Sequence, residues 1–129
     1  MKEKRTYKMY FDDILTAIDR IFEYTQDYDF LRFKRDYKTV DAVIRNFQII
    51  GEAAKNIPHE IKTQYSDVPW DEMYSLRNRI SHAYFGVDYE IIWTILTDYL
   101  PENKAQIEKI LSVSNTDISE YKSSKSKES

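Results

Sequence analysis

Apolar residues recur at intervals of three and four along most of this chain, which is the spacing typical of amphipathic α-helices. The first run extends from about residue 4 to residue 28, with a stripe that includes Phe11 and Ile14. A second helical region covers about residues 29–57. Pro58 disfavours helical geometry at the residue before it, so this region is expected to end there.

The second half of the chain predicts a short helix or turn at about residues 59–65, followed by another long helix. The segment Ser66-Asp67-Val68-Pro69 is typical of a helix start, because serine and aspartate can cap the first turn and proline fits into it. This helix is expected to run from about residue 69 to residue 85. It should end near Gly86, since glycine commonly follows the last helical residue.

Asp88 is expected to cap a fourth long helix, in which Pro101 should cause a kink or an interruption before the apolar stripe resumes at Ile107. Four long amphipathic helices and a short helix, joined by short connections, predict an all-α, up-and-down bundle. The bundle is expected to span residues 1–111 as one domain. Residues 112–129 are rich in serine, lysine and glutamate and are expected to form a disordered polar tail.

The composition excludes several classes of protein. The chain has 129 residues and no cysteine, which excludes disulfides and thiolate sites and fits a reducing cytoplasm. No apolar run approaches the ~20 residues of a membrane span, so no membrane partner is expected. A net charge of −3 argues against non-specific coating of nucleic acid, although a small basic site remains compatible with it. Two histidines without cysteine, and no glycine-rich phosphate loop, predict neither a metal nor a cofactor.

The segment from Arg77 to Tyr84 concentrates polar groups that can handle phosphate. Arginine carries a permanent cation with planar donors, and the pKa of an unperturbed histidine lies near neutrality. With Arg77 at 0° on a helical wheel, an apolar face at about 240–320° is formed by Met73, Leu76, Ile80 and Ala83. The polar set falls outside this sector and is expected on the side turned away from the core. An ordinary solvated face is the alternative, but the aromatic residues among the polar ones favour a contact surface.

This stretch, preceded by Ile50-Gly51-Glu52-Ala53-Ala54-Lys55 and Val68-Pro69-Trp70, resembles the HepT-like branch of the HEPN superfamily. The superfamily motif is an arginine, four to six residues of which the first is usually polar, and a histidine. Arg77, Asn78 and His82 match it, and Tyr84 matches the tyrosine that the HepT branch adds. The resemblance covers about residues 5–111. It implies a small, dimeric, all-helical ribonuclease toxin that is paired with a nucleotidyltransferase antitoxin of the MntA type.

The resemblance implies a metal-independent endonuclease in which the 2′-OH of the RNA is the nucleophile. His82 would act as base or acid, and Arg77 would hold the scissile phosphate and stabilise its developing charge. Asn78 could orient His82, and Ser81 is a candidate RNA contact. Arg79, at about 200° on the wheel, is an RNA candidate that is more typical of an exposed or dimer-contact residue. One protomer supplies one motif histidine, so a symmetric homodimer is expected to join two motifs in one cleft.

Tyr84 has two interpretations. Its ring could pack at the helix end, with the hydroxyl on a backbone partner. The resemblance implies instead that the antitoxin attaches AMP to this hydroxyl, which would place negative charge beside Arg77 and silence the nuclease. The main alternative to an enzyme is a non-catalytic helical subunit that binds a nucleotidyltransferase and is modified by it. His82 discriminates between the two, because docking needs no titratable group there.

Three further features are weaker candidates. Glu52 could face inward and pair with Arg77 across the bundle, or it could simply be exposed. A basic cluster could guide RNA phosphates, although a solvated loop is the favoured alternative; it comprises Arg32, Lys34, Arg35 and Lys38. His59 follows Pro58 at a helix start and is expected to be a surface residue.

Overall fold

The computed structural model describes residues 6–81 and 88–112. Its helices are α1 (Tyr7–Tyr24), α2 (Phe30–Arg35), α3 (Tyr37–Asn56), α4 (His59–Gln64), α5 (Trp70–Ser81), α6 (Tyr89–Thr94) and a π-helical segment, η1 (Ile95–Tyr99), which residues 100–112 continue. These described residues contain no strand, which confirms the predicted all-α class. Of the expected polar tail, Ser112 is still helical, and residues 113–129 lie outside the described residues.

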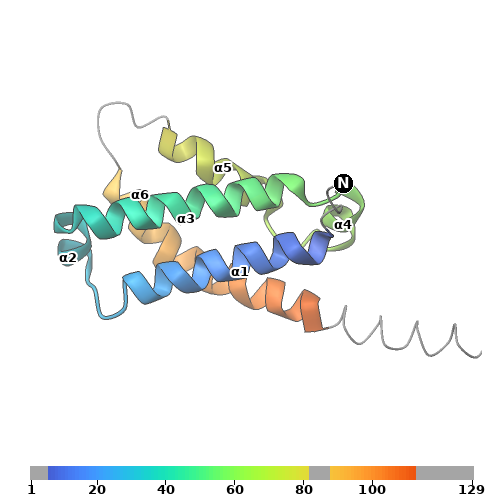
Figure 1. Cartoon of the computed structure of the whole chain (residues 1–129), viewed down its shortest axis with the longest axis horizontal. Helices are drawn as coiled ribbons and strands as arrows, with labels where there is room; N and C mark the ends of the chain where they lie inside the picture. The colour runs from blue at the N-terminus through green and yellow to red at the C-terminus, as the bar shows by residue number, and fades with distance from the viewer. Residues whose placement is uncertain (1–5, 82–87, 113–129) are drawn as a thin grey trace, which may run out of the picture.

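Successive long helices alternate in direction, which is the up-and-down arrangement that the sequence predicts (Figure 1). α3 lies at the centre and packs against both α1 and α5, while α2 contacts α3 and α6. Within residues 6–81 and 88–112, no helix combines the length and the apolarity that a membrane span requires.

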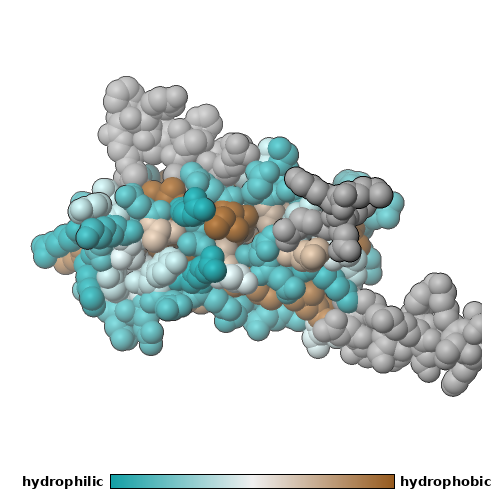
Figure 2. Space-filling model, in the orientation of Figure 1, coloured by the Kyte–Doolittle hydropathy of each residue, from teal (hydrophilic) through white to brown (hydrophobic). Residues whose placement is uncertain are grey.

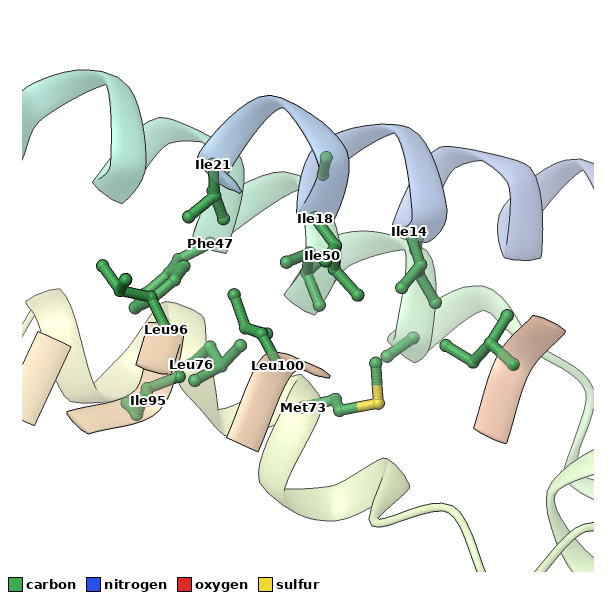
Figure 3. Close-up of a cluster of buried hydrophobic side chains, with 14 of the residues drawn as sticks. Ile14, Ile18, Ile21, Phe47, Ile50, Met73, Leu76, Ile95, Leu96 and Leu100 are labelled. Carbon is green, nitrogen blue, oxygen red and sulfur yellow. The ribbon is translucent and has the colours of Figure 1, made fainter. Parts of the chain in front are cut away.

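The core confirms the amphipathic stripes of the sequence. Residues three or four apart return to the same side of a helix, so each stripe is buried as a unit. Figure 3 shows side chains from α1, α3, α5 and the last helix converging on one interior. The residues at its centre are almost completely buried and include Ile14, Ile18, Ile21, Phe47, Ile50, Met73 and Leu100.

α1 ends at Tyr24, about one turn before the predicted end at residue 28. The hydroxyl of Thr25 donates a hydrogen bond to the Ile21 carbonyl at 2.8 Å, and Asp27 adopts a positive φ of 64° in the turn that follows. Aspartate tolerates this left-handed geometry better than most residues. The chain therefore leaves the helix at this point and turns toward α2.

The predicted helical region 29–57 consists of two helices, because Asp36 interrupts it. The Asp36 backbone is non-helical (φ −101°, ψ 83°), and its carboxylate accepts hydrogen bonds from the Thr39 amide (3.2 Å) and hydroxyl (2.7 Å). An aspartate with these bonds caps the first turn of a helix, so α3 begins at Tyr37 and the short α2 precedes it. The predicted helix end before Pro58 is confirmed.

The last helix is distorted before Pro101 and is not interrupted there. The chain stays helical from residue 89 to residue 112, and the π segment η1 lies just before the proline. Proline has no amide hydrogen, and its ring clashes with the carbonyl four residues earlier, which here belongs to Thr97. The wider π turn accommodates this clash. The Thr97 hydroxyl donates to the Trp93 carbonyl at 2.8 Å, and the apolar stripe continues to the fully buried Ile107.

Candidate functional site

The helix that carries the candidate motif starts where the sequence predicts. The Trp70 amide donates to the Val68 carbonyl (2.8 Å), and the Met73 amide donates to the Pro69 carbonyl (3.0 Å), which is the first helical bond. Two acidic residues, Asp71 and Glu72, occupy the first turn of α5. Their negative charges are favourable there, because the amino end of a helix carries a partial positive charge.

Trp70 anchors α5 to the rest of the bundle. Its side chain is only 6% exposed, and its ring stacks on that of Phe11 in α1 with centroids 5.7 Å apart. The indole Nε1 donates a hydrogen bond to the Tyr65 carbonyl at 3.0 Å. Because both the apolar face and the polar atom of the indole are satisfied, Trp70 sets the rotation of α5 about its own axis.

The motif lies in the last turns of α5 and in the residues that follow. Arg77, Asn78, Arg79 and Ser81 belong to the described backbone of this helix. His82 and Tyr84 lie outside the described residues. The proposed roles of all six residues therefore stay predictions. In the view of Figure 1, α5 crosses α3 obliquely, and its carboxyl end stands clear of α3.

The buried face of α5 is wider than the helical wheel suggested. Met73 and Leu76 are buried, as predicted, and Trp70 adds a third buried position at about 20° on the same wheel. The packed side of α5 is therefore set by Trp70, Met73 and Leu76, which precede the motif.

Glu52 is exposed, which agrees with one of its two predicted alternatives. The buried residues of α3 include Val43, Phe47, Ile50 and Ala54, and a residue two positions after Ile50 points to the opposite side of the helix. An inward-facing carboxylate is therefore not the arrangement in this bundle. A supporting role toward Arg77 stays a prediction.

The basic cluster is exposed to solvent, as the favoured interpretation predicts, but it lies on helices and not on a loop. Arg32, Lys34 and Arg35 belong to α2, and Lys38 belongs to the first turn of α3. All four are exposed, as is His59 at the start of α4, which lies 3.5 Å from the Thr63 hydroxyl. His59 is thus the surface residue that the sequence predicts.

A small pocket of about 140 Å³ lies beside the motif-bearing helix, between α5 and the last helix. Sequence reasoning missed it, because its walls come from segments that are distant in the chain. The π segment contributes Tyr99, which is 52% exposed, and Asn103 is a buried polar residue just beyond it. The remaining lining residues are Pro69, Glu72, Met73, Leu76 and Ile95. Across the described ranges, no group of three or more His, Cys, Asp or Glu side chains could hold a metal ion.

The fold and the motif together define a class: small all-helical proteins with an Arg-x4-His motif at the end of a bundle helix. A family model described as Ribonuclease HepT-like matches residues 14–110, so the chain belongs to the HepT-like ribonuclease family. The matched range begins within α1 and ends in the last helix, and it includes the whole motif.

Relatives from other organisms agree with this assignment. A protein of Thermococcus cleftensis named as a probable ribonuclease HepT is 44% identical over 83% of this chain and 97% of its own length. A candidate RNase of Methanocaldococcus jannaschii is 41% identical over 84% of this chain and 89% of its own length. A candidate RNase of Caldanaerobacter subterraneus is 36% identical over 83% of this chain and 96% of its own length. No solved structure matches the chain significantly.

Proposed function

We propose that this chain is a metal-independent RNA endonuclease and the toxin of a toxin–antitoxin pair. One observation carries the proposal: a chain of the HepT-like ribonuclease family has the sequence motif of Arg77 and His82, and the arginine lies on α5, a helix whose start is anchored by Trp70. His82 moves a proton between the 2′-OH, the phosphate and the leaving oxygen, and Arg77 stabilises charge on the phosphate. Asn78, Ser81 and Arg79 orient these groups or contact the RNA.

The active unit in this proposal is a homodimer with the two motifs in one cleft. Exposed apolar side chains near α5 support it, because large apolar side chains at a surface favour contact with another protein. Tyr74 on α5 is 36% exposed, and Tyr99, which lines a pocket together with residues of α5, is 52% exposed. A second copy that covers them would bring two copies of α5 near each other.

Regulation acts through Tyr84 in this proposal. A nucleotidyltransferase antitoxin of the MntA type attaches AMP to the tyrosine hydroxyl, which breaks the α–β phosphoanhydride of ATP and releases pyrophosphate. The phosphate of each AMP adds negative charge near Arg77, which then competes with the RNA for this cation. Cleavage should therefore stop when Tyr84 is modified.

The two histidines of the chain provide a matched test of catalysis. His82→Ala should lower the rate of RNA cleavage by about 10²–10⁴-fold, as loss of a general acid–base group does. His59→Ala changes the other histidine, on the exposed start of α4, and should cleave at the wild-type rate. EDTA should leave both rates unchanged. Equal cleavage by the two variants would refute the mechanism and favour a non-catalytic partner of the nucleotidyltransferase.

A mixing experiment tests whether one cleft uses both protomers. Wild-type and His82→Ala chains are unfolded together, refolded in varied ratios and assayed for cleavage. If each cleft needs two histidines, activity should fall with the square of the wild-type fraction. A linear fall would show that each protomer works independently, and this would contradict the shared cleft.

Modification is tested by incubating the chain with its nucleotidyltransferase partner and ATP. Mass spectrometry should find adenylate on Tyr84 of the wild-type chain, and cleavage should be lost in proportion to the modified fraction. Tyr84→Phe should stay unmodified and active. An adenylate on another tyrosine, or undiminished cleavage after modification of Tyr84, would overturn this part of the proposal.

A further inference from the structure

A broad groove lies at the end of the bundle where α2 meets the start of α3. Its volume is about 690 Å³, and the cations on its wall are Arg32, Arg35 and Lys38. Figure 2 shows that hydrophilic residues dominate this end of the molecule, with apolar patches nearer its middle. The described residues that line the groove all belong to residues 28–38, which precede the motif-bearing helix in the chain.

The groove cations are available to an external anion. Within the described parts of the chain, Lys34, Arg35 and Lys38 make no ion pair or side-chain hydrogen bond. The Arg32 guanidinium lies 4.0 Å from the centroid of the Tyr28 ring, which holds the cation without neutralising it. An anion with several charges would therefore find donors that no carboxylate of the fold already occupies.

The two carboxylates in the groove wall are engaged in local structure. Asp29 accepts a hydrogen bond from the Arg32 amide at 2.8 Å and caps α2. Asp36 accepts from the Tyr28 hydroxyl at 2.6 Å and from Thr39, and these bonds lower the pKa of Asp36 to about 2. The wall thus has three cations against two carboxylates. This balance is positive in a chain whose net charge is −3.

Exposed apolar groups lie among these cations. Tyr37 is 67% exposed and Leu31 is 60% exposed, although both follow the caps that position their helices. Unpaired bases of RNA stack on aromatic side chains while cations hold the phosphates. A surface that combines an exposed tyrosine with unneutralised arginine and lysine fits a single strand of RNA better than it fits a free phosphate.

The groove is held firmly and lies at the end of the bundle where α5 ends (Figure 1). Phe33 of α2 is completely buried, and its ring centroid lies 5.3 Å from that of Trp93, just after the start of the last helix. Phe30 contacts the same indole at 6.3 Å. α5 ends and α6 begins at this end of the bundle, as Figure 1 shows. A strand bound in the groove could therefore extend toward the carboxyl end of α5.

We propose that the α2–α3 groove is an accessory site for single-stranded RNA. Arg32, Arg35 and Lys38 bind backbone phosphates, and Tyr37 stacks on a base. The inference rests on the proposed ribonuclease function, because it takes the bound strand to be the substrate outside the scissile phosphate. In this proposal, the groove increases the affinity for RNA, and the Arg77–Tyr84 motif carries out the cleavage.

The test separates binding from cleavage. In the full chain with His82→Ala, binding of a short labelled single-stranded RNA is measured at several salt concentrations. Arg32→Gln/Arg35→Gln/Lys38→Gln should raise the Kd about tenfold at low salt and reduce the slope of log Kd against log salt by ~2, as loss of three phosphate contacts predicts. The control, Lys55→Gln/Lys62→Gln/Lys109→Gln, removes the same charge from other parts of the surface and should bind like the parent.

Tyr37→Leu provides a second measurement. It should weaken RNA binding about fivefold or more without changing the salt slope, and it should not affect an abasic strand with the same phosphates. In the cleaving chain, the groove substitutions should raise KM and leave kcat near the wild-type value.

Several results would overturn the accessory site. The first is that the His82→Ala parent does not bind RNA. The second is that the groove triple variant and the control triple variant weaken binding equally. The third is that the groove triple variant keeps its RNA affinity but no longer binds a protein partner. Each variant is expected to fold, because the caps Asp29 and Asp36 stay in place. Circular dichroism and thermal melting check this. If His82→Ala cleaves like wild type, the catalytic proposal fails, whereas the affinity results still decide whether the groove binds RNA.

Discussion

The two ends of this bundle differ in how completely their polar and aromatic groups are used within the fold. At the end near α4, the Trp70 ring stacks on Phe11, and its nitrogen donates a hydrogen bond to the Tyr65 carbonyl. At the end near α2, Tyr37 is mostly exposed, and the nearby cations Lys34, Arg35 and Lys38 have no partner in the described parts.

This difference indicates a division of labour between stability and binding. Groups that are satisfied internally contribute to folding, because burial and hydrogen bonding favour the folded chain. Groups that are left exposed contribute little to folding and stay available to a ligand. The end near α4 is thus expected to hold the bundle together, and the end near α2 is expected to meet other molecules.

The end near α4 is called the closed end, and the end near α2 is called the open end. The largest expected effect is at the closed end. Trp70→Ala should lower the free energy of unfolding by about 3–5 kcal/mol, because it removes a buried ring and leaves a cavity against Phe11. Urea denaturation measures this change. Tyr37→Ala is the control at the open end and should cost less than about 0.5 kcal/mol, since its ring is exposed. Similar costs for the two variants would break the comparison.

A smaller effect is expected from the cap that separates α2 from α3. Asp36→Ala should lower the melting temperature by about 3–5 °C, because the Thr39 amide loses its side-chain acceptor. Asp36→Asn keeps an acceptor at this place and should melt within about 2 °C of wild type. If the alanine variant lost as much stability as Trp70→Ala, the open end would be essential to folding.

A still smaller effect is expected midway along the bundle. Lys104 pairs with Asp19 at 2.8 Å, with side chains 33% and 57% exposed. Lys104→Ala should cost less than 1 kcal/mol, because solvent screens an exposed ion pair. The same measurement in high salt should show an even smaller difference. A cost above that of a buried aromatic residue would show that ion pairs, and not the closed end, hold the bundle together.

The smallest effect should be present near neutral pH and should disappear at low pH. The Tyr28 hydroxyl and Thr39 lower the pKa of Asp36 from 3.8 to about 2, so this carboxylate stabilises the fold above pH 4 and loses that contribution as the pH falls toward 2. Tyr28→Phe should raise the pKa of Asp36 toward 3.8, as an NMR titration measures. Its melting temperature should be below that of wild type near neutral pH and should approach it near pH 2. A difference that persists undiminished at pH 2 would contradict this account.

Several features were predictable because they depend on neighbouring residues. The stripe of α1, the helix end before Pro58 and the start of α5 near Pro69 follow from local spacing and from the geometry of proline. The cap at Asp36 is also a local signal. The apolar pattern continues on both sides of it, however, and therefore predicts one helical region where the structure has two helices. The family motif was visible for the same reason, since its arginine and its histidine are separated by only four residues in the sequence.

Amino-acid order by itself determined the helices, their approximate limits and the family motif with its candidate polar residues. Only the tertiary structure decided the rotation of α5, because the Trp70 anchor depends on Phe11 and Tyr65 from other segments. It also placed the cations of α2 at the bundle end where α6 begins, through the contact of Phe33 with Trp93. The physical reason is range: caps and helical periodicity act within a few residues, whereas packing joins residues that are far apart in the chain.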